Sequence, residues 1–511
     1  MLKDNKILIG KSRNLKDAAI LPSMANRHGL ICGATGTGKT VTLKVMAESF
    51  SDLGVPVFLA DVKGDLAGCV RRGERSEALD KRLSGVAVDP DSFPYKSFPV
   101  SFWDVFGEGG HPVRTTVSAM GATLFSRLLG LSEAQTGVLS IVFRVADDKG
   151  WLLVDLKDLR AMVAYVTDHA PELLSRYGNV TRQSAGAIQR ALLQLEDAGG
   201  DLFFGEPAID LSDWMRTDES GRGYINIFDC RKLAQSPLLY STFMLWLLAE
   251  LFERLPEVGD PEKPRLVFFF DEAHLLFRDA PRALNDKVEQ VVKLIRSKGV
   301  GVYFITQQPA DIPNPVIAQL GNRVEHALRA YTPTELKAVR AAAMSFRENP
   351  EFDTEAAIMD LGTGEAIVSF LDEKGAPSMA ERVTILPPQS QMGAIDDDRR
   401  AAEISADDLY GKYEKAVDNP SAYEILTEKQ REAEAEAERE RAAAEEARKK
   451  EAEEKAKAKA AESEKKAKSK KTSAASSALN RVTNSALSSI GREFGREISR
   501  GIMNTIKGLF K

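Results

Sequence analysis

Residues 33–40 constrain the fold of this chain more than any other stretch, because they read GATGTGKT, the pattern of a phosphate-binding loop. The apolar run 29–32 before the loop predicts a buried strand, and the run 41–46 after it predicts a helix. Between a strand and a helix, glycines let successive backbone N–H groups point at an anion at the positive end of the helix. The sequence therefore predicts a nucleoside triphosphate bound by Gly33, Ala34, Thr35, Gly36, Thr37, Gly38, Lys39, Thr40 and Val41.

Two side chains of this loop have predicted catalytic roles. We expect Lys39 between the β- and γ-phosphates and the Thr40 hydroxyl as a ligand of Mg²⁺. Far downstream, the apolar run 265–270 predicts a second buried strand that ends in adjacent carboxylates. We expect Asp271 to hold Mg²⁺ and Glu272 to accept a proton from the attacking water. Since the chain contains no Asn-Lys-x-Asp guanine-reading motif, ATP is the predicted nucleotide.

A further apolar run, 299–305, predicts a buried strand that is followed by two glutamines. We expect Gln307 to bind the γ-phosphate or the attacking water and to report loss of the phosphate; an ordinary amide at a strand end is the alternative. Arg296, just before this strand, is a candidate arginine finger for the phosphate of a neighbouring subunit. Arg323 and Arg329 are rival candidates.

The strand predicted over residues 55–61 ends in the polar sequence Asp61-Val62-Lys63-Gly64-Asp65. In parallel α/β sheets, the carboxyl ends of the strands carry the ligand-facing residues. This segment is therefore either part of the nucleotide site or a plain polar turn, and the sequence leaves both interpretations open.

Charge is distributed unevenly along the chain. The formal net charge is -6, yet the tail after residue 427 holds more Lys and Arg than Asp and Glu, so the body is acidic. An acidic body argues against broad adhesion to nucleic acid, although a ring can enclose a basic channel. The 3 cysteines and 5 histidines show neither disulfide nor zinc spacing. Because we find no secretion signal and no membrane span in the sequence, we expect a soluble cytoplasmic protein.

The order of these patterns predicts an α/β fold with a mainly parallel sheet, a helical insertion and a long helical C-terminal tail. Residues 1–110 hold the first part of the nucleotide-binding core, and residues 221–390 hold the second part with the acidic strand. Apolar residues at three- and four-residue spacing predict a mostly helical insertion over 111–220. We expect a charged helical or disordered linker over 391–471 and an amphipathic basic helix over 472–511.

The amino-acid sequence of several segments resembles that of HerA-like P-loop ATPases, within the FtsK- and HerA-type translocases. It is most similar to a bacterial family of stand-alone HerA-like proteins. The similarity extends over about residues 26–387 and is most specific in the segments 26–33, 60–66 and 111–116. The resemblance implies a RecA-like fold, hexameric rings and ATP hydrolysis at subunit interfaces. It also favours Arg296 as the finger that acts on a neighbouring subunit. Archaeal HerA proteins carry a small β-barrel before the core, and this chain has no room for one.

Two functions remain open at this stage. The first is a ring-forming, ATP-driven DNA translocase or helicase, which the resemblance implies. The second is an ATPase that remodels a protein or membrane-associated complex recruited by the tail. The basic helix predicted over 472–511 needs a partner surface, and its own ring, another protein and an anionic membrane are the candidates. An ATP-binding scaffold without turnover is disfavoured by the intact Asp271-Glu272 pair.

Overall fold

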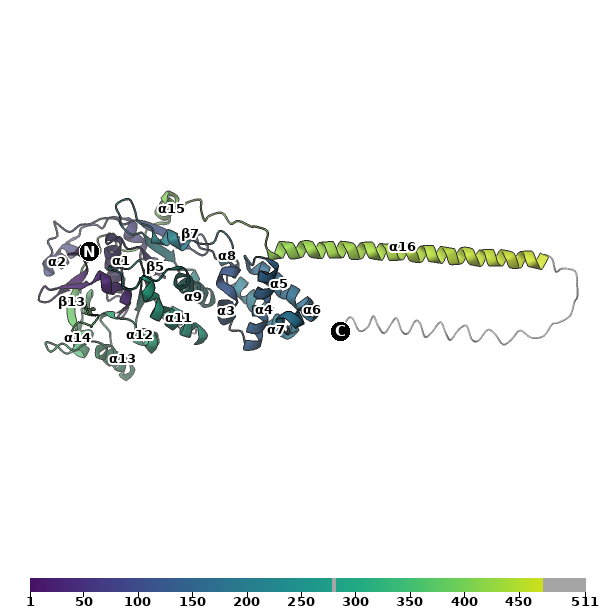
Figure 1. Cartoon of the computed structure of the whole chain (residues 1–511). Helices are drawn as coiled ribbons and strands as arrows, with labels where there is room; N and C mark the ends of the chain where they lie inside the picture. Colours follow the sequence, from purple (N-terminus) through teal and green to yellow (C-terminus); the bar gives the residue numbers. More distant parts are fainter. Residues whose placement is uncertain (278–281, 472–511) are drawn as a thin grey trace. The chain divides into compact units, whose positions relative to one another are not determined.

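The computed structural model describes residues 1–277 and 282–471, so the basic helix predicted over 472–511 lies outside the described residues. The chain divides into two compact units, Met1–Glu428 and Lys429–Lys511. The first unit contains the sheet and helices α1 to α15, and α16 (Ala422–Lys471) begins at its end and continues into the second unit. The fold of the first unit is shown in Figure 1.

A 13-stranded sheet forms the centre of the first unit. Eight of its strands run parallel, and one strand, β10, lies between the phosphate-loop strand β4 and the acidic strand β9. In spatial order the parallel strands are β11 (Asn322–His326), β4 (Gly29–Cys32), β10 (Val300–Thr306), β9 (Leu266–Phe270), β5 (Val57–Asp61), β8 (Ile225–Asp229), β6 (Val100–Asp104) and β7 (His111–Pro112).

Five further strands extend the sheet beyond β11 with antiparallel pairing. They are β12 (Glu365–Ser369), β13 (Glu381–Ile385), β2 (Lys6–Ser12), β1 (Leu2–Lys3) and β3 (Asp17–Ile20). The N-terminal strands therefore join the sheet next to strands from the end of the core, and residues distant in sequence build one structure. The predicted α/β class with a mainly parallel sheet is confirmed.

Both faces of the parallel strands are buried, which explains why their sequences are almost continuously apolar. Side chains at alternate positions divide between two hydrophobic clusters, one on each face. Helix α1 (Lys39–Asp52) covers one face with Leu43, Met46 and Phe50. Helices α9 (Pro237–Arg254) and α11 (Arg282–Ile295) cover the other. The remaining helices of the core are α2 (Glu77–Gly85), α10 (His274–Phe277), α12 (Asn314–Ile317), α13 (Pro333–Met344) and α14 (Thr354–Asp360).

The predicted helical insertion is a block of six helices between β7 and β8, and Figure 1 shows most of them gathered beside the sheet. They are α3 (Val117–Leu128), α4 (Glu133–Lys149), α5 (Leu156–Asp168), α6 (Ala170–Tyr177), α7 (Arg182–Asp197) and α8 (Gly200–Phe203). Helix α3 is broken at Gly121, whose φ of 72° lies in the left-handed region. Several helices begin at side-chain caps, such as Ser132 before α4 and Asp155 before α5. The insertion shares its hydrophobic cluster with the sheet face under α9, so it is continuous with the core.

Residues 387–426, which we call the strap, connect the sheet to the insertion. The strap includes helix α15 (Asp397–Ala406), whose buried Arg400 donates hydrogen bonds to Asp229 (3.1 Å) and to the Gly109 carbonyl (3.0 Å). At the other end, Ser421 donates to Asp158 of the insertion at 2.7 Å. The sequence predicts a linker from residue 391, whereas the structure keeps residues up to Glu428 in the first unit. The anchoring side chains are scattered and not periodic, so these contacts cannot be predicted from a sequence pattern.

His111 fastens the middle of the strap. Its Nδ1 atom donates to the Glu414 carboxylate at 2.6 Å, and its Nε2 atom lies 3.5 Å from Asp407. Asp407 also accepts hydrogen bonds from Arg216 (3.0 Å) and Ser101 (2.5 Å). Burial lowers the pKa of His111, but the two carboxylates outweigh burial and raise the pKa above 6.5. The charged form of the His111 imidazole therefore stabilises the folded protein.

We expect His111→Gln to destabilise the protein by about 1 kcal/mol at mildly acidic pH, since a charge-assisted hydrogen bond is lost. A group with a raised pKa contributes its full stability below the unfolded value of 6.5, and loses the contribution as the pH rises through the folded pKa. The cost of the substitution should therefore shrink above pH 6.5. Urea unfolding of both proteins across this range measures the effect, and a pH-independent cost would contradict the role given to His111.

Helix α16 is rich in Ala, Glu, Lys and Arg, and its described side chains beyond residue 428 are exposed. Acid–base pairs one turn apart occur along it, such as Lys449 with Glu445 at 2.8 Å and Lys450 with Glu446 at 2.8 Å. Such pairs support a solvated helix without a hydrophobic partner. The long helical tail of the predicted fold is thus confirmed through Lys471. Over the described residues, no helix has both the length and the apolar character needed to cross a membrane.

Candidate active site

The loop over residues 33–40 joins β4 to α1 with a backbone that needs glycine at two close approaches. Gly33 has a φ of 147°, and a Cβ atom there would lie 2.4 Å from the Cβ of His326. Gly38 caps α1 with a φ of 117°, and its Cβ would lie 3.1 Å from the Cα of Gly364. The loop therefore closes tightly over the first turn of α1, which presents the positive end of the helix to an anion.

Residues that the sequence analysis did not single out support this loop from behind. His326, at the carboxyl end of β11, donates from Nδ1 to the Glu365 carbonyl and accepts at Nε2 from the Thr42 hydroxyl, both at 2.9 Å. Burial lowers the pKa of His326 to about 4, so the ring is neutral and this pattern of donor and acceptor is fixed. Arg82 donates to the Gly364 carbonyl at 2.6 Å. The partners are distant in sequence, so local pattern gave no signal for these roles.

Lys39 and Thr40 begin helix α1 at the mouth of the loop. The Lys39 ammonium donates to the carbonyls of Gly33 (2.6 Å) and Ala34 (3.1 Å). Burial and the charge of Lys63 lower the pKa of Lys39. A desolvated ammonium is stabilised more by an anion than by neutral carbonyls. The surroundings of Lys39 therefore favour the predicted contact with phosphate.

The acids of β9 lie at the same edge of the sheet as the phosphate loop. Residue 306 of β10 pairs with residue 32 of β4, and residue 304 pairs with residue 270 of β9, so all three strands end together. Asp271 is 4% exposed, and burial raises its pKa to about 7. Thr40 and Asp271 carry oxygen atoms of the kind that Mg²⁺ prefers. A cation is already accommodated near this carboxylate, since the Lys63 ammonium lies 3.9 Å from Asp271.

Glu272 collects three nitrogen atoms around its carboxylate. The Lys63 ammonium lies 2.6 Å from Oε1, while Gln307 Nε2 at 3.4 Å and His274 Nδ1 at 3.3 Å lie beside Oε2. Burial would raise the pKa of Glu272, but Lys63 outweighs burial and the pKa is lowered. The backbone of Glu272 has a φ of 48°, an unusual value for a residue with a side chain. The structure thus brings Gln307 and Glu272 together at the end of neighbouring strands.

Arg296 lies at the opposite edge of the sheet, in the turn before β10, where it donates to Asp260 at 2.7 Å. The seven residues of β10 separate it from its own phosphate loop by about 20 Å. Arg323 lies at the amino end of β11 and donates to backbone carbonyls. Arg329 lies on the phosphate-loop side and lines a cavity of about 270 Å³ with Ala34 and Gln307. Only Arg329 among the three candidates is near the loop of its own chain.

A parallel α/β sheet with a phosphate loop, adjacent acids and a polar amide at the carboxyl edge defines a P-loop ATPase with RecA-like architecture. The model of the family described as "Helicase HerA-like C-terminal" matches residues 6–511. The chain belongs to this family, as the resemblance in its sequence predicts.

A curated relative is the probable helicase MJECL08 of Methanocaldococcus jannaschii, which is 28% identical over 154 residues. That match covers 28% of this chain and 28% of the relative. Among solved structures, the bacterial conjugative coupling protein TrwBdeltaN70 is 14% identical, with 76% of this chain and 89% of that chain covered and a TM-score of 0.49. VirB4 of Thermoanaerobacter pseudethanolicus is 16% identical, with 75% and 97% covered and a TM-score of 0.48.

Proposed function

We propose that this protein is a motor that hydrolyses ATP and translocates DNA. The observation that carries the proposal is the convergence of Lys39, Glu272 and Gln307 at one edge of the sheet. A base beside a strand-end amide, across from a phosphate-binding lysine, is the arrangement that ATP hydrolysis needs. Membership of a HerA-like helicase family supports DNA as the substrate that the motor moves.

Each residue of the site has a definite task in this proposal. Backbone N–H groups of residues 33–41 and the Lys39 ammonium bind the phosphates. The Thr40 hydroxyl and the Asp271 carboxylate hold Mg²⁺, which neutralises phosphate charge when it is bound. Glu272 orients the attacking water and accepts its proton. Gln307 lies 3.4 Å from Glu272 and lines the cavity beside the phosphate loop, which supports a role in reporting the loss of the γ-phosphate to α13.

We further propose that the active form is a ring of six copies. Arg296 lies at the edge opposite its own loop, so it contributes to hydrolysis only if a second copy presents its loop to it. An arginine supplied by a neighbouring subunit stabilises the charge on the transferred phosphoryl group. Mass measurement of the full chain with a non-hydrolysable ATP analogue tests the assembly. A protein that stays monomeric at micromolar concentration, with full ATPase activity, would disprove it.

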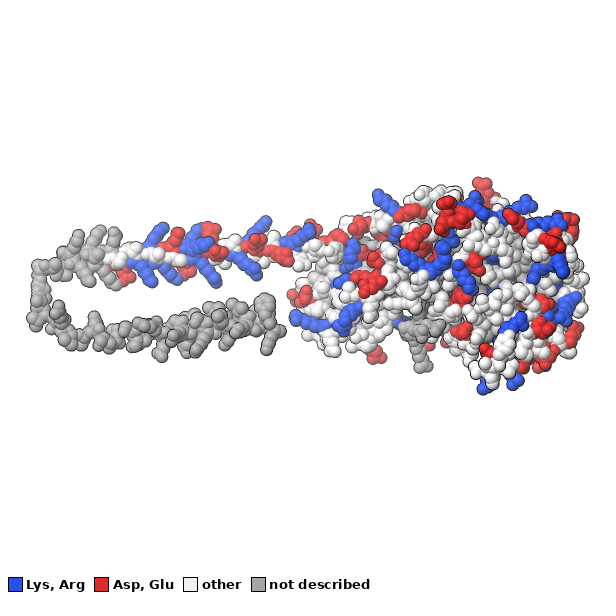
Figure 2. All heavy atoms as spheres, turned by 180° about the vertical axis from the view of Figure 1, so that it is seen from behind, with Lys and Arg blue, Asp and Glu red and all other residues white. Residues whose placement is uncertain are grey.

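DNA stimulation of ATP hydrolysis tests the proposed function directly. We expect double-stranded DNA at low salt to raise the ATPase rate several-fold, and DNA binding to weaken steeply as the salt concentration rises. Figure 2 shows Lys and Arg interspersed with Asp and Glu on one face of the molecule. Our proposal places the DNA contact inside the ring, since a ring can enclose a basic channel. A hexameric preparation that hydrolyses ATP and ignores DNA would replace this function by remodelling of a protein or membrane-associated complex. Deleting residues 472–511 would then abolish capture of that complex.

A further inference from the structure

Lys63 is a cation in the active site to which the proposed mechanism gives no task. It follows β5, and β5 runs parallel to β9 with residue 60 opposite residue 270, so the ends of the two strands are neighbours. The Lys63 ammonium lies 2.6 Å from the Oε1 atom of Glu272 and 3.9 Å from the Oδ2 atom of Asp271. One lysine thus bridges the carboxylate expected to bind the metal and the carboxylate expected to act as base.

The backbone that carries Lys63 is fixed on both sides. The buried Asp61 accepts hydrogen bonds from the backbone N–H groups of Gly64 (2.7 Å) and Leu66 (3.3 Å). Gly64 has a φ of 79°, and the side chain of Arg231 covers it so closely that a Cβ there would lie 2.9 Å from Arg231 Cδ. These contacts restrain the backbone of the turn, whereas the side chain of Lys63 is long and flexible and can change its partners.

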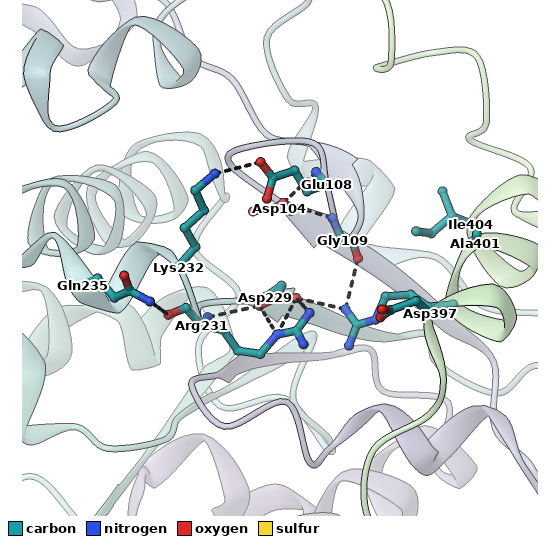
Figure 3. Close-up of a pocket in the computed structure, with 11 residues that line it drawn as sticks. Asp104, Glu108, Gly109, Asp229, Arg231, Lys232, Gln235, Asp397, Ala401 and Ile404 are labelled. Carbon is teal, nitrogen blue, oxygen red and sulfur yellow. Dashed lines mark hydrogen bonds and ion pairs between the residues drawn. The ribbon is translucent and has the colours of Figure 1, made fainter.

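Arg231 is held in turn by Asp229, as Figure 3 shows. Its guanidinium donates to both carboxylate oxygens of Asp229, at 3.0 Å and 2.6 Å, and Asp229 also accepts from Arg400 of the strap. Because these groups satisfy one another, Asp229 does not compete with Glu272 and Asp271 for Lys63, and Arg231 does not compete with Lys63 for those two carboxylates. The Lys63 side chain is 41% exposed, whereas Glu272 and Asp271 are nearly buried, so the ammonium approaches the carboxylates from the open side of the site.

A second cation at the same carboxylates is unfavourable while Lys63 remains there. Lys39 already stands near the pair, and the two ammonium groups repel each other. The addition of Mg²⁺ beside Asp271 would place three positive centres within one small, partly desolvated site. Phosphate charge offsets part of this repulsion, but a metal beside Asp271 would need oxygen atoms of a carboxylate that already lies near Lys63. Repulsion and shared ligands both favour withdrawal of Lys63.

We propose that Lys63 is a positioning residue that occupies the carboxylates of Glu272 and Asp271 before nucleotide binds, and that it leaves them when Mg²⁺ and nucleotide enter. The inference rests on the ATP site proposed above. Lys63 holds Glu272 away from water while no substrate is bound, and its departure frees the base at the moment the metal is in place. As a consequence, nucleotide binding requires a higher Mg²⁺ concentration.

The test measures the Mg²⁺ concentration that gives half-maximal binding of a fluorescent ADP analogue to the full-length protein. We expect Lys63→Met to lower this concentration roughly threefold, because a half-exposed ion pair no longer competes with the metal. Lys63→Arg keeps the charge and is expected to keep the wild-type requirement. Lys232→Met is the matched control, since it removes an exposed lysine that pairs with Glu108 at 2.7 Å at the same edge of the sheet. This control should leave the requirement unchanged.

A different result separates the competing explanations. If Lys63 helps to bind phosphate, Lys63→Met weakens binding of the analogue in EDTA and raises the Mg²⁺ requirement, and the proposal is overturned. A purely structural lysine would lower the melting temperature in Lys63→Met with no change in Mg²⁺ requirement, which also overturns it. If wild-type protein binds no ADP analogue at any Mg²⁺ concentration, the proposed ATP site fails and the inference fails with it.

Discussion

Replacing Glu272 by Gln is expected to lower the rate of ATP hydrolysis roughly a thousandfold while nucleotide binding is preserved. The amide keeps the shape of the side chain and an oxygen for Lys63, but it cannot accept a proton from the attacking water. Phosphate release from the purified full-length protein, under saturating Mg²⁺ and ATP, measures the loss. Binding of the fluorescent ADP analogue, measured on the same preparation, checks that the site remains intact.

Glu373→Gln provides the control for this substitution, because Glu373 is exposed in a turn after β12. It removes one negative charge and is expected to leave the rate unchanged. If Glu272→Gln retained more than about a tenth of wild-type turnover, the role of general base would have to pass to another group. Asp271 is the neighbouring carboxylate that would then have to be considered.

Replacing Lys39 by Ala is expected to impair nucleotide binding, the step before hydrolysis. A charge-assisted hydrogen bond to phosphate is worth about 1.5–3 kcal/mol, so the dissociation constant for Mg²⁺-ADP should rise roughly ten- to a hundredfold. Hydrolysis should also become undetectable, because the lysine neutralises the phosphate in the reaction. Titration calorimetry with ADP measures the affinity.

Lys6→Ala is a suitable comparison for Lys39→Ala, since Lys6 is an exposed residue at the start of β2. The two active-site variants should also differ from each other. Glu272→Gln should retain ATP for many minutes without cleaving it, whereas Lys39→Ala should not retain it. Unaltered ADP affinity in Lys39→Ala would mean that the ammonium keeps its contacts with the carbonyls of Gly33 and Ala34 when nucleotide is bound, and contributes nothing to phosphate recognition.

Sequence alone predicted the parts of the site whose chemistry is local. The phosphate loop is one uninterrupted segment, and the Asp271-Glu272 pair directly follows the strand that positions it. The sheet order is non-local, yet the buried apolar runs and the spacing of the motifs were enough to predict a mainly parallel α/β fold. The sequence also pointed to the polar turn after β5, although it left two interpretations open.

Contacts between segments that are distant along the chain could not be predicted from the sequence. The bond from Lys63 to Glu272 depends on the register between β5 and β9, and the bond from Thr42 to His326 depends on where β11 meets α1. Neither pair shows a spacing that could be recognised along the chain. The candidate fingers illustrate the same limit, since Arg296 and Arg329 are similar in sequence terms but lie at opposite edges of the sheet.

The strap and the exposed part of helix α16 differ in how strongly the fold constrains their lengths. A chain that ended near residue 390 would leave Asp229 without Arg400, His111 without Glu414 and Asp158 without Ser421, at three separate points of the first unit. Insertions and deletions between residues 391 and 426 are therefore constrained by anchors at both ends. Beyond Glu428 the described helix side chains are exposed, so burial places no such constraint on the length of α16 there.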